Sequence, residues 1–447
     1  MHFNHLYIVL FLTALLVNIP MGYLRQGCAK FSLKWFFWIH ASIPILIYLR
    51  LKWGVSAWFI PLSIFFAVIG QILGSRLKRK CVTREETERL HQIPDLNISL
   101  SAPIEEKDVM VVLLNMGGPK TNEDVADFQR RLFSDSILIR FPLSFLFQKI
   151  FAWILVKARL KASKARYQLI GGGSPIYAST QAQTQALLQE LQRRGRNIDV
   201  LFSFNYSPPF PEETMKKIKD KGKKYILPLS LYPHYSNATT GSNLHYLKLA
   251  ANKICPKVNF LNTPSYYLHN GYIEAFVDRV KEAVKPGESL DDFYFLFSAH
   301  GLPVYSLMKG DPYPFQINQT VSKILSQINR TKNWALCYQS AVGPLQWLKP
   351  STEDMLSALA SRGIKKILVI PVAFVGDHIE SLCEIDIEYR HAAVKLGIED
   401  FRMTKAIESH PRFIEALADS VEDIVKEGYQ EIRKSEGRIS EEQNIRS

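Results

Sequence analysis

The amino-acid sequence predicts an α/β protein with two parallel-sheet units, preceded by an N-terminal segment of about three transmembrane helices. Three observations support this prediction. All acidic residues lie after residue 84, three long apolar runs fill the segment before it, and short strand-like runs alternate with helical patterns in the remainder.

The formal net charge of +13 comes mainly from the N-terminal segment. The chain has 55 Lys and Arg against 42 Asp and Glu, but residues 1–84 contain ten basic residues and no acidic ones. The remaining 363 residues carry a net charge of only +3 and have no dense run of Lys or Arg, which argues against a nucleic-acid partner. A hydrophobic content of 47% excludes a disordered chain.

Three apolar runs, at about 6–24, 33–51 and 55–74, define a predicted membrane anchor over residues 1–80. Each run approaches the roughly 20 helical residues needed to cross a hydrocarbon core of about 30 Å. A cleaved signal peptide would show one such run rather than three. The alternative, a buried helical hairpin of a soluble fold, stays open at this point.

Positive charge at the ends of these runs predicts the orientation of the anchor. Three basic residues follow the first run and five follow the third, whereas only Arg50 and Lys52 follow the second. Loops rich in Lys and Arg stay on the cytoplasmic side, so eight basic residues against two place the body of the chain in the cytoplasm. We therefore expect a bacterial inner-membrane protein with membrane lipid as a partner. The five scattered cysteines, none in a C-x-x-C pair, fit a reducing compartment.

The body of the chain divides into two predicted α/β units, 108–285 and 290–425, between a linker at 81–107 and a polar tail at 426–447. Short apolar runs of the buried-strand type alternate there with helical patterns, and these runs cover 109–115, 200–204, 225–230, 293–298, 334–338 and 367–373. Such alternation predicts parallel sheets with crossover helices. In sheets of this kind the chemistry lies beyond the carboxyl ends of the strands.

A histidine stands at one of these strand ends. The predicted strand 293–298 runs directly into Ala299-His300-Gly301, and the following Pro303 turns the chain. His300 is thus a candidate for acid–base or metal chemistry, with a purely structural histidine as the alternative.

An acidic stripe follows another strand end. If residues 377–391 are helical, four carboxylates share one face at spacings of three, four and four, with His378 at its start: Asp377, Glu380, Glu384 and Glu388. Like charges at this spacing destabilise a helix unless something compensates them. Carboxylates with an imidazole suit a divalent metal or a proton path. The alternative is a solvated acidic face for which Asp377 is the N-cap.

Two glycine-rich segments lack the spacing of nucleotide-binding loops. Gly171-Gly172-Gly173-Ser174 has no Walker-type Lys-Ser/Thr, and Gly117-Gly118-Pro119 lacks the dinucleotide pattern. They are either tight turns or places where the backbone closely approaches a large flat ligand.

The segment 137–155 is almost wholly apolar, and Arg159, Lys161, Lys164 and Arg166 follow it. An apolar lip beside a basic cluster would suit an amphipathic substrate with carboxylates that arrives from a membrane. Burial in the core is the alternative.

Several long motifs together resemble the ferrochelatase family. They occur in the order typical of that family and span most of residues 108–420: LNMGGP (114–119), YQLIGGGSPI (167–176), LYPHYSNATTGS (231–242), LFSAHGLP (296–303), GDPYP (310–314), YQSAVGPLQWLKP (338–350) and PVAFVGDHIESLCEIDIEY (371–389).

The resemblance implies two Rossmann-like, chelatase-type domains and a lyase that inserts Fe²⁺ into protoporphyrin IX, the terminal step of haem biosynthesis. It implies that His300 is the active-site histidine, that Glu380 is its partner carboxylate, and that Asp377 and His378 adjoin them. Glu384 and Glu388 match an acidic row proposed to conduct metal or protons. The residues implied to contact the porphyrin are Met116, Tyr167, Ser174, Tyr206 and Trp347, with Arg159 near its propionates.

Three departures from the family pattern refine these expectations. Members with a [2Fe-2S] cluster hold it through cysteines at the position of Asn237 and after Cys383, so we expect no cluster and no cofactor beyond the substrate Fe²⁺. Asn205 replaces an arginine, which puts a metal-entry role of that position in doubt. Met116 is typical of members that act on protoporphyrin IX, whereas those that act on coproporphyrin III usually carry Tyr.

Three other functions stay open from the sequence. They are a coproporphyrin III ferrochelatase, a cobalt or nickel chelatase for another tetrapyrrole, and a non-catalytic membrane haem-binding protein. The sequence does not predict the oligomeric state.

Overall fold

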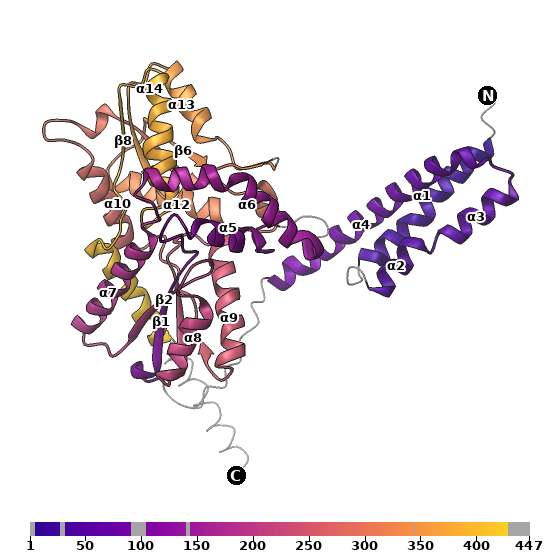
Figure 1. Ribbon diagram of the computed structural model, residues 1–447. Coiled ribbons are helices and arrows are strands. Elements are labelled where there is room, and N and C mark those ends of the chain that lie inside the picture. Colours follow the sequence, from indigo (N-terminus) through magenta and orange to yellow (C-terminus); the bar gives the residue numbers. More distant parts are fainter. Residues whose placement is uncertain (1–4, 27–31, 91–103, 140–143, 344, 428–447) are drawn as a thin grey trace, which may run out of the picture. The chain divides into compact units, whose positions relative to one another are not determined.

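The computed structural model describes residues 5–26, 32–90, 104–139, 144–343 and 345–427 (Figure 1). The predicted tail from residue 428 onward and residues 91–103 of the predicted linker lie outside these ranges. The chain forms two compact units, Met1–Ile98 and Ser99–Ser447, and we describe each by itself.

The first unit is helical. It comprises α1 (His5–Gln26), α2 (Leu33–His40), α3 (Ile43–Lys52), a 3₁₀ turn (Ala57–Phe59) and α4 (Ile60–Leu90). Helix α4 thus continues into the first ten residues of the predicted linker.

The three predicted membrane spans are not confirmed as three long helices. Within the described residues, only α1 has an apolar stretch long enough to cross a bilayer, Ile8–Arg25, and the apolar part of α4 is the shorter Ile60–Ser75. The predicted span 33–51 is wrong as one continuous helix, since α2 and α3 separate at residues 41–42. Pro44 has no N–H to donate to the carbonyl of His40, which explains the break.

The first unit buries several polar side chains, together with apolar ones such as Leu10, and exposes many large apolar side chains. Asn18 and Gln71 are 1% and 6% exposed, whereas Leu16 and Ile64 are 60% and 58% exposed. The Gln71 amide donates to Asn18 Oδ1 at 3.1 Å. A Cβ on Gly74 would lie 1.9 Å from the carbonyl oxygen of Ile19, so α1 and α4 approach each other backbone to backbone.

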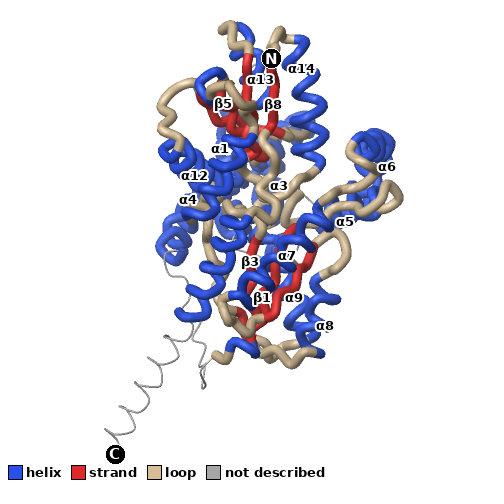
Figure 2. The backbone as a smooth tube through the Cα atoms, turned by 90° about the vertical axis from the view of Figure 1, so that its left-hand side faces the viewer, coloured by secondary structure: helices blue, strands red, loops and turns tan. Residues whose placement is uncertain are grey.

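The second unit has the predicted α/β architecture, with two four-stranded parallel sheets (Figure 2). The first sheet has the order β2-β1-β3-β4, built from β1 (Val109–Asn115), β2 (Asp199–Phe204), β3 (Tyr225–Ser230) and β4 (Asn259–Phe260). The second has the order β6-β5-β7-β8, built from β5 (Tyr294–His300), β6 (Trp334–Gln339), β7 (Lys366–Pro371) and β8 (Asp400–Met403). Sequence analysis missed the two short edge strands, β4 and β8.

Helices connect the strands. Those of the first half are α5 (Val125–Ser134), α6 (Ser144–Leu169), α7 (Ile176–Arg193), α8 (Pro211–Asp220), α9 (Ser242–Ile254) and α10 (Asn270–Glu282). Those of the second half are α11 (Val304–Leu307), α12 (Tyr313–Gln327), α13 (Thr352–Ser361), a π-helix η5 (Glu380–Tyr389), α14 (Arg390–Lys395) and a helix over 411–427.

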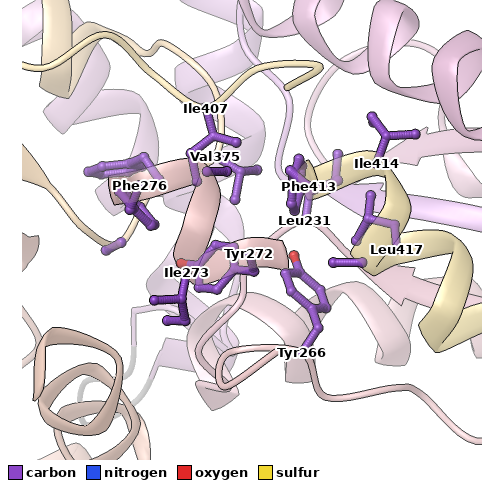
Figure 3. Close-up of a cluster of buried hydrophobic side chains, with 14 of the residues drawn as sticks. Leu231, Tyr266, Tyr272, Ile273, Phe276, Val375, Ile407, Phe413, Ile414 and Leu417 are labelled. Carbon is purple, nitrogen blue, oxygen red and sulfur yellow. The ribbon is translucent and has the colours of Figure 1, made fainter. Parts of the chain in front are cut away.

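One hydrophobic core joins the two halves. It contains fully buried residues of the first sheet, such as Val111, and of the second, such as Phe297. Tyr272 of α10 and Phe413 of the last helix lie between them with ring centroids 6.1 Å apart (Figure 3). The shared core holds the carboxyl ends of both sheets in a fixed relation, which a site built from both halves requires.

Candidate active site

His300 is the last residue of β5 and is held by its own strand end. Its Nδ1 lies 2.7 Å from the carbonyl oxygen of Gly301. A carbonyl can only accept, so Nδ1 carries the proton and Nε2 presents a free lone pair. The Tyr313 hydroxyl donates to the main-chain carbonyl of His300 at 2.9 Å. The imidazole is therefore set as a proton acceptor at Nε2.

Phe374, in the turn after β7, lies between two histidines. Its ring centroid is 6.5 Å from that of His300 and 5.0 Å from that of His378. Burial lowers the pKa of His378, an effect that Glu380 and Asp377 oppose and His300 reinforces. His378 is thus neutral near pH 7. Because the Phe374 ring contacts both histidines, the two predicted strand ends meet.

Glu380 begins the π-helix and faces residues of the first half. Its backbone carbonyl accepts from the Gln339 amide at 3.0 Å. Burial and then the Glu380 charge raise the pKa of Tyr167 on α6. Burial also raises the pKa of Tyr232, which follows β3, and Glu380 adds to that shift. The carboxylate therefore lies near hydroxyls that the first sheet and α6 supply.

Glu380, Glu384 and Glu388 lie on a π-helix rather than an α-helix, and Asp377 and His378 precede it, so the predicted helix over 377–391 begins later than expected. Residues 380–389 form i→i+5 hydrogen bonds, a rare geometry that often marks functional sites. The spacing of three, four and four cannot distinguish the two helix types, so sequence analysis gave no sign of this difference.

The other carboxylates of the stripe are each engaged elsewhere. Asp377 accepts from Ser381 Oγ at 2.9 Å, and burial raises its pKa. Glu384 accepts from Ser340 N and Oγ at 2.9 and 2.6 Å and from the Tyr389 hydroxyl at 2.8 Å. Glu388 pairs with Arg166 at 2.8 Å. Across the described ranges, no three His, Cys, Asp or Glu side chains form a group that could hold a metal ion.

The first sheet ends in neutral groups. Asn115, the last residue of β1, accepts at Oδ1 from Met116 N and from the Tyr232 hydroxyl, both at 2.7 Å. Tyr206 is 4% exposed, and its hydroxyl donates to Asp135. Tyr167 is also buried, at 5%. This end of the first sheet is therefore not acidic. We call these neutral groups, together with Met116, the floor of the site.

The two glycine-rich segments pack against each other. A Cβ on Gly173 would lie 2.0 Å from the carbonyl oxygen of Lys120, and one on Gly118 would lie 2.7 Å from the Cβ of Ser174. Ser174 N donates to the Pro119 carbonyl at 2.8 Å. The glycines therefore allow two loops of the chain to approach each other closely.

Trp347 and Arg159 complete the predicted set. Trp347 is half-buried, pairs with Pro303 in an isolated antiparallel bridge, and donates from Nε1 to the Val342 carbonyl at 3.0 Å. Its ring lies 3.3 Å from the position of a Cβ on Gly301, beside His300. Arg159 is half-buried on α6, and no contact brings it to His300 or Glu380.

Sequence analysis missed several residues of this site. Tyr232, Tyr313, Gln339, Ser340 and Phe374 all lie within the quoted motifs, but nothing in the sequence distinguished them from their neighbours. Asp135 lies outside every motif. Its signal could have been a lone acid after an amphipathic helix, just before an apolar segment.

Comparison with known proteins agrees with the motifs. A family model described as Ferrochelatase matches residues 108–424. The ferrochelatase of Synechococcus elongatus is 41% identical over 322 residues, which cover 71% of this chain and 83% of the relative. That of Gloeobacter violaceus is 42% identical over 317 residues, which cover 70% of this chain and 97% of the relative.

Similarity to solved structures is weaker. SirB from Bacillus subtilis with Fe³⁺ has 14% identity and a TM-score of 0.42 over 71% of this chain and 95% of that one, too little to support a conclusion. The match of the family model and the two relatives over most of the chain is decisive: the chain belongs to the ferrochelatase family.

Proposed function

We propose that the protein is a lyase that inserts Fe²⁺ into protoporphyrin IX to give protohaem. The observation that carries this proposal is the meeting of His300, His378 and Glu380 at the carboxyl end of the second sheet, opposite the neutral hydroxyls of the first half.

Metal insertion requires a base. Two pyrrole N–H protons must leave as the macrocycle nitrogens bind the metal, and an imidazole exchanges protons near neutral pH. His300 Nε2 would accept one of these protons, because the Gly301 carbonyl keeps the proton on Nδ1, and would release it to solvent before it accepts the second. Glu380, with the neutral His378 beside it, would attract the incoming cation. Asp377, Glu384 and Glu388 each bind other groups of the chain. We therefore propose that they support the fold and conduct the metal, and that they do not hold a resident metal ion.

Metal insertion also requires a distorted macrocycle, so that its nitrogen lone pairs face the metal. Binding energy from the remote parts of the ring can supply that distortion. We assign this role to Met116 and Trp347, with Tyr167, Ser174 and Tyr206 supporting the floor and Arg159 near the propionates. Met116 favours protoporphyrin IX over coproporphyrin III.

The decisive experiment is fluorometric insertion of Zn²⁺ and Fe²⁺ into protoporphyrin IX and coproporphyrin III in parallel. We expect insertion into protoporphyrin IX to dominate. Dominant insertion into coproporphyrin III would reassign the substrate, and tight porphyrin binding without insertion would instead support a haem-binding protein.

We further propose that the enzyme works without an iron–sulfur cluster. Cys337 and Cys383 are buried, and Cys255 is partly exposed. The as-purified protein should contain no acid-labile sulfide and no visible absorption from a cluster. A stoichiometric amount of sulfide would contradict this.

We also propose that the first unit anchors the enzyme in a membrane, with the body in the cytoplasm. The first unit buries polar side chains such as Asn18 and Gln71 and exposes many large apolar ones such as Leu16 and Ile64, which is the pattern of helices that face lipid. On α6, the exposed Trp153 and Ile154 precede Lys157 and Lys161, which suits a surface that receives a substrate from lipid.

Extraction with alkaline carbonate tests the anchor. The full chain should stay in the membrane pellet, and Leu16→Arg on the outward face of α1 should weaken that retention. As a matched control, Lys52→Arg keeps the charge and should change nothing. Release of the unmodified chain would contradict the proposal.

A further inference from the structure

A buried carboxylate lies at the end of α5, outside every motif. Asp135 is 3% exposed, and in the described part of the chain no Lys or Arg forms an ion pair with it. Its Oδ1 accepts from Ile137 N at 2.6 Å. Its Oδ2 accepts from the Tyr206 hydroxyl and from Ser242 Oγ, the latter at 3.3 Å. Burial and then Asp135 raise the pKa of Tyr246, one turn along α9.

Neutral donors thus replace a cation around this charge. A buried carboxylate is costly unless hydrogen bonds satisfy it, so the donors and the acid hold each other in place. They come from the turn after α5, from the loop after β2 and from α9. Asp135 therefore fixes three segments relative to one another.

The same network continues to the end of β1. Ser242 Oγ accepts from Asn205 Nδ2 at 3.1 Å, and Asn243 Nδ2 donates both to Asn205 Oδ1 at 3.1 Å and to the Asn115 carbonyl at 2.8 Å. Asn115 in turn holds Met116 N, and Tyr206 N donates to the Met116 carbonyl at 3.0 Å. Asn205 is thus a link in this network.

Asp135 also stands where the chain leaves α5 toward α6. Helix α6 is tied back to α5 by bonds from Gln129 Nε2 to Ser163 Oγ at 2.6 Å and from Gln148 Nε2 to the Phe133 carbonyl at 2.9 Å. A shift of the turn at Asp135 would therefore move both α6 and the floor at Met116.

We propose that Asp135 is a positioning residue for porphyrin binding: it holds Tyr206 and the turn at 136–139 against α9, and so sets the positions of Met116 and α6. It does not touch the reacting atoms. This inference rests on the proposed chelatase function, because it concerns how that enzyme binds its macrocycle.

Kinetics of the full-length Asp135→Asn variant test the role. We expect the KM for protoporphyrin IX to rise about tenfold, the scale of a lost hydrogen bond to a charged group. The kcat and the KM for Zn²⁺ should stay within about twofold. Asp127→Asn, an exposed acid on α5, is the matched control and should leave all three unchanged. A fall in kcat at unchanged porphyrin KM would overturn the proposal.

A second variant covers the case in which Asp135→Asn fails to fold. Tyr206→Phe removes one donor and should raise the porphyrin KM in the same way, and the double variant should be no worse than the worse single variant. Hydrogen exchange of residues 136–139 should accelerate in both, and fluorescence titration should show weaker protoporphyrin binding. These two readouts need no turnover, so they remain informative if the unmodified protein lacks chelatase activity. Unchanged exchange and unchanged binding in Tyr206→Phe would refute the role of Asp135.

Discussion

The two sheets of the second unit have the same strand order but end in different chemistry. The first, β2-β1-β3-β4, ends in amides, hydroxyls and a thioether around Asn115 and Met116. The second, β6-β5-β7-β8, ends in His300, His378 and the π-helix that begins at Glu380. Under the proposed function, the first sheet supplies the surface that holds a macrocycle, and the second sheet supplies the groups that accept protons and attract a cation.

The largest expected effect follows from removing His300, the proposed proton acceptor at the end of the second sheet. His300→Ala should lower kcat for metal insertion by about 10²–10⁴-fold, the usual contribution of a positioned acid or base. Glu380→Ala should act similarly. Fluorometric insertion into protoporphyrin IX measures both, and porphyrin binding should survive. His245→Ala, at an exposed histidine of α9, is the control. Normal turnover in His300→Ala would remove the basis for the mechanism.

The second-largest effect concerns the stripe. Glu384→Gln should lower the free energy of unfolding by about 2–3 kcal/mol, because Ser340 and Tyr389 lose a charged acceptor. Glu388→Gln, four residues further, removes only a half-exposed ion pair and should cost no more than about 1 kcal/mol. Urea titration of the full chain in detergent measures both. A higher KM for metal at unchanged stability in Glu384→Gln would show that Glu384 acts in metal transit and does not support the fold.

Acid should lower the stability of the fold through a buried histidine of the first half that is neutral in the folded chain. His234 is fully buried against Thr320, and burial lowers its pKa to about 3. The unfolded chain binds a proton near pH 6.5 while the folded one does not, so stability is complete above that pH and declines as pH falls toward 3. At pH 5 the loss is about 2 kcal/mol.

Unfolding midpoints in urea between pH 7 and pH 5 measure this loss. His234→Asn should flatten the pH dependence, whereas His391→Asn, at an exposed position, should keep it. Equal slopes in both variants would show that another group is responsible.

The smallest expected effect tests whether the end of the first sheet determines substrate specificity. Met116→Tyr should shift the ratio of kcat/KM for protoporphyrin IX over coproporphyrin III by about tenfold toward coproporphyrin, the scale of one altered contact in a binding pocket. Parallel fluorometric assays give this ratio. A change in kcat for both substrates alike would instead place Met116 with the reactive groups.

Sequence analysis predicted most of the fold because buried parallel strands are short apolar runs with clear ends, and it placed His300 and Glu380 through long motifs. It could not predict the edge strands β4 and β8, which have two and four residues and little apolar pattern. It also could not predict the hydrogen bond from Ser340 to Glu384, 44 residues apart in the sequence, or the one from Tyr206 to Asp135, 71 residues apart. Such partners depend on how the sheets pack and leave no local pattern.

The Arg166–Glu388 pair links α6 to the π-helix of the other half. Both side chains are half exposed, so dissolved ions weaken their attraction, and at about 1 M salt the screening length falls to about 3 Å. Ionic strength therefore acts on a link between α6, which we propose receives the macrocycle, and the helix that carries Glu380. Salt near 1 M should therefore weaken this pair without altering a single residue.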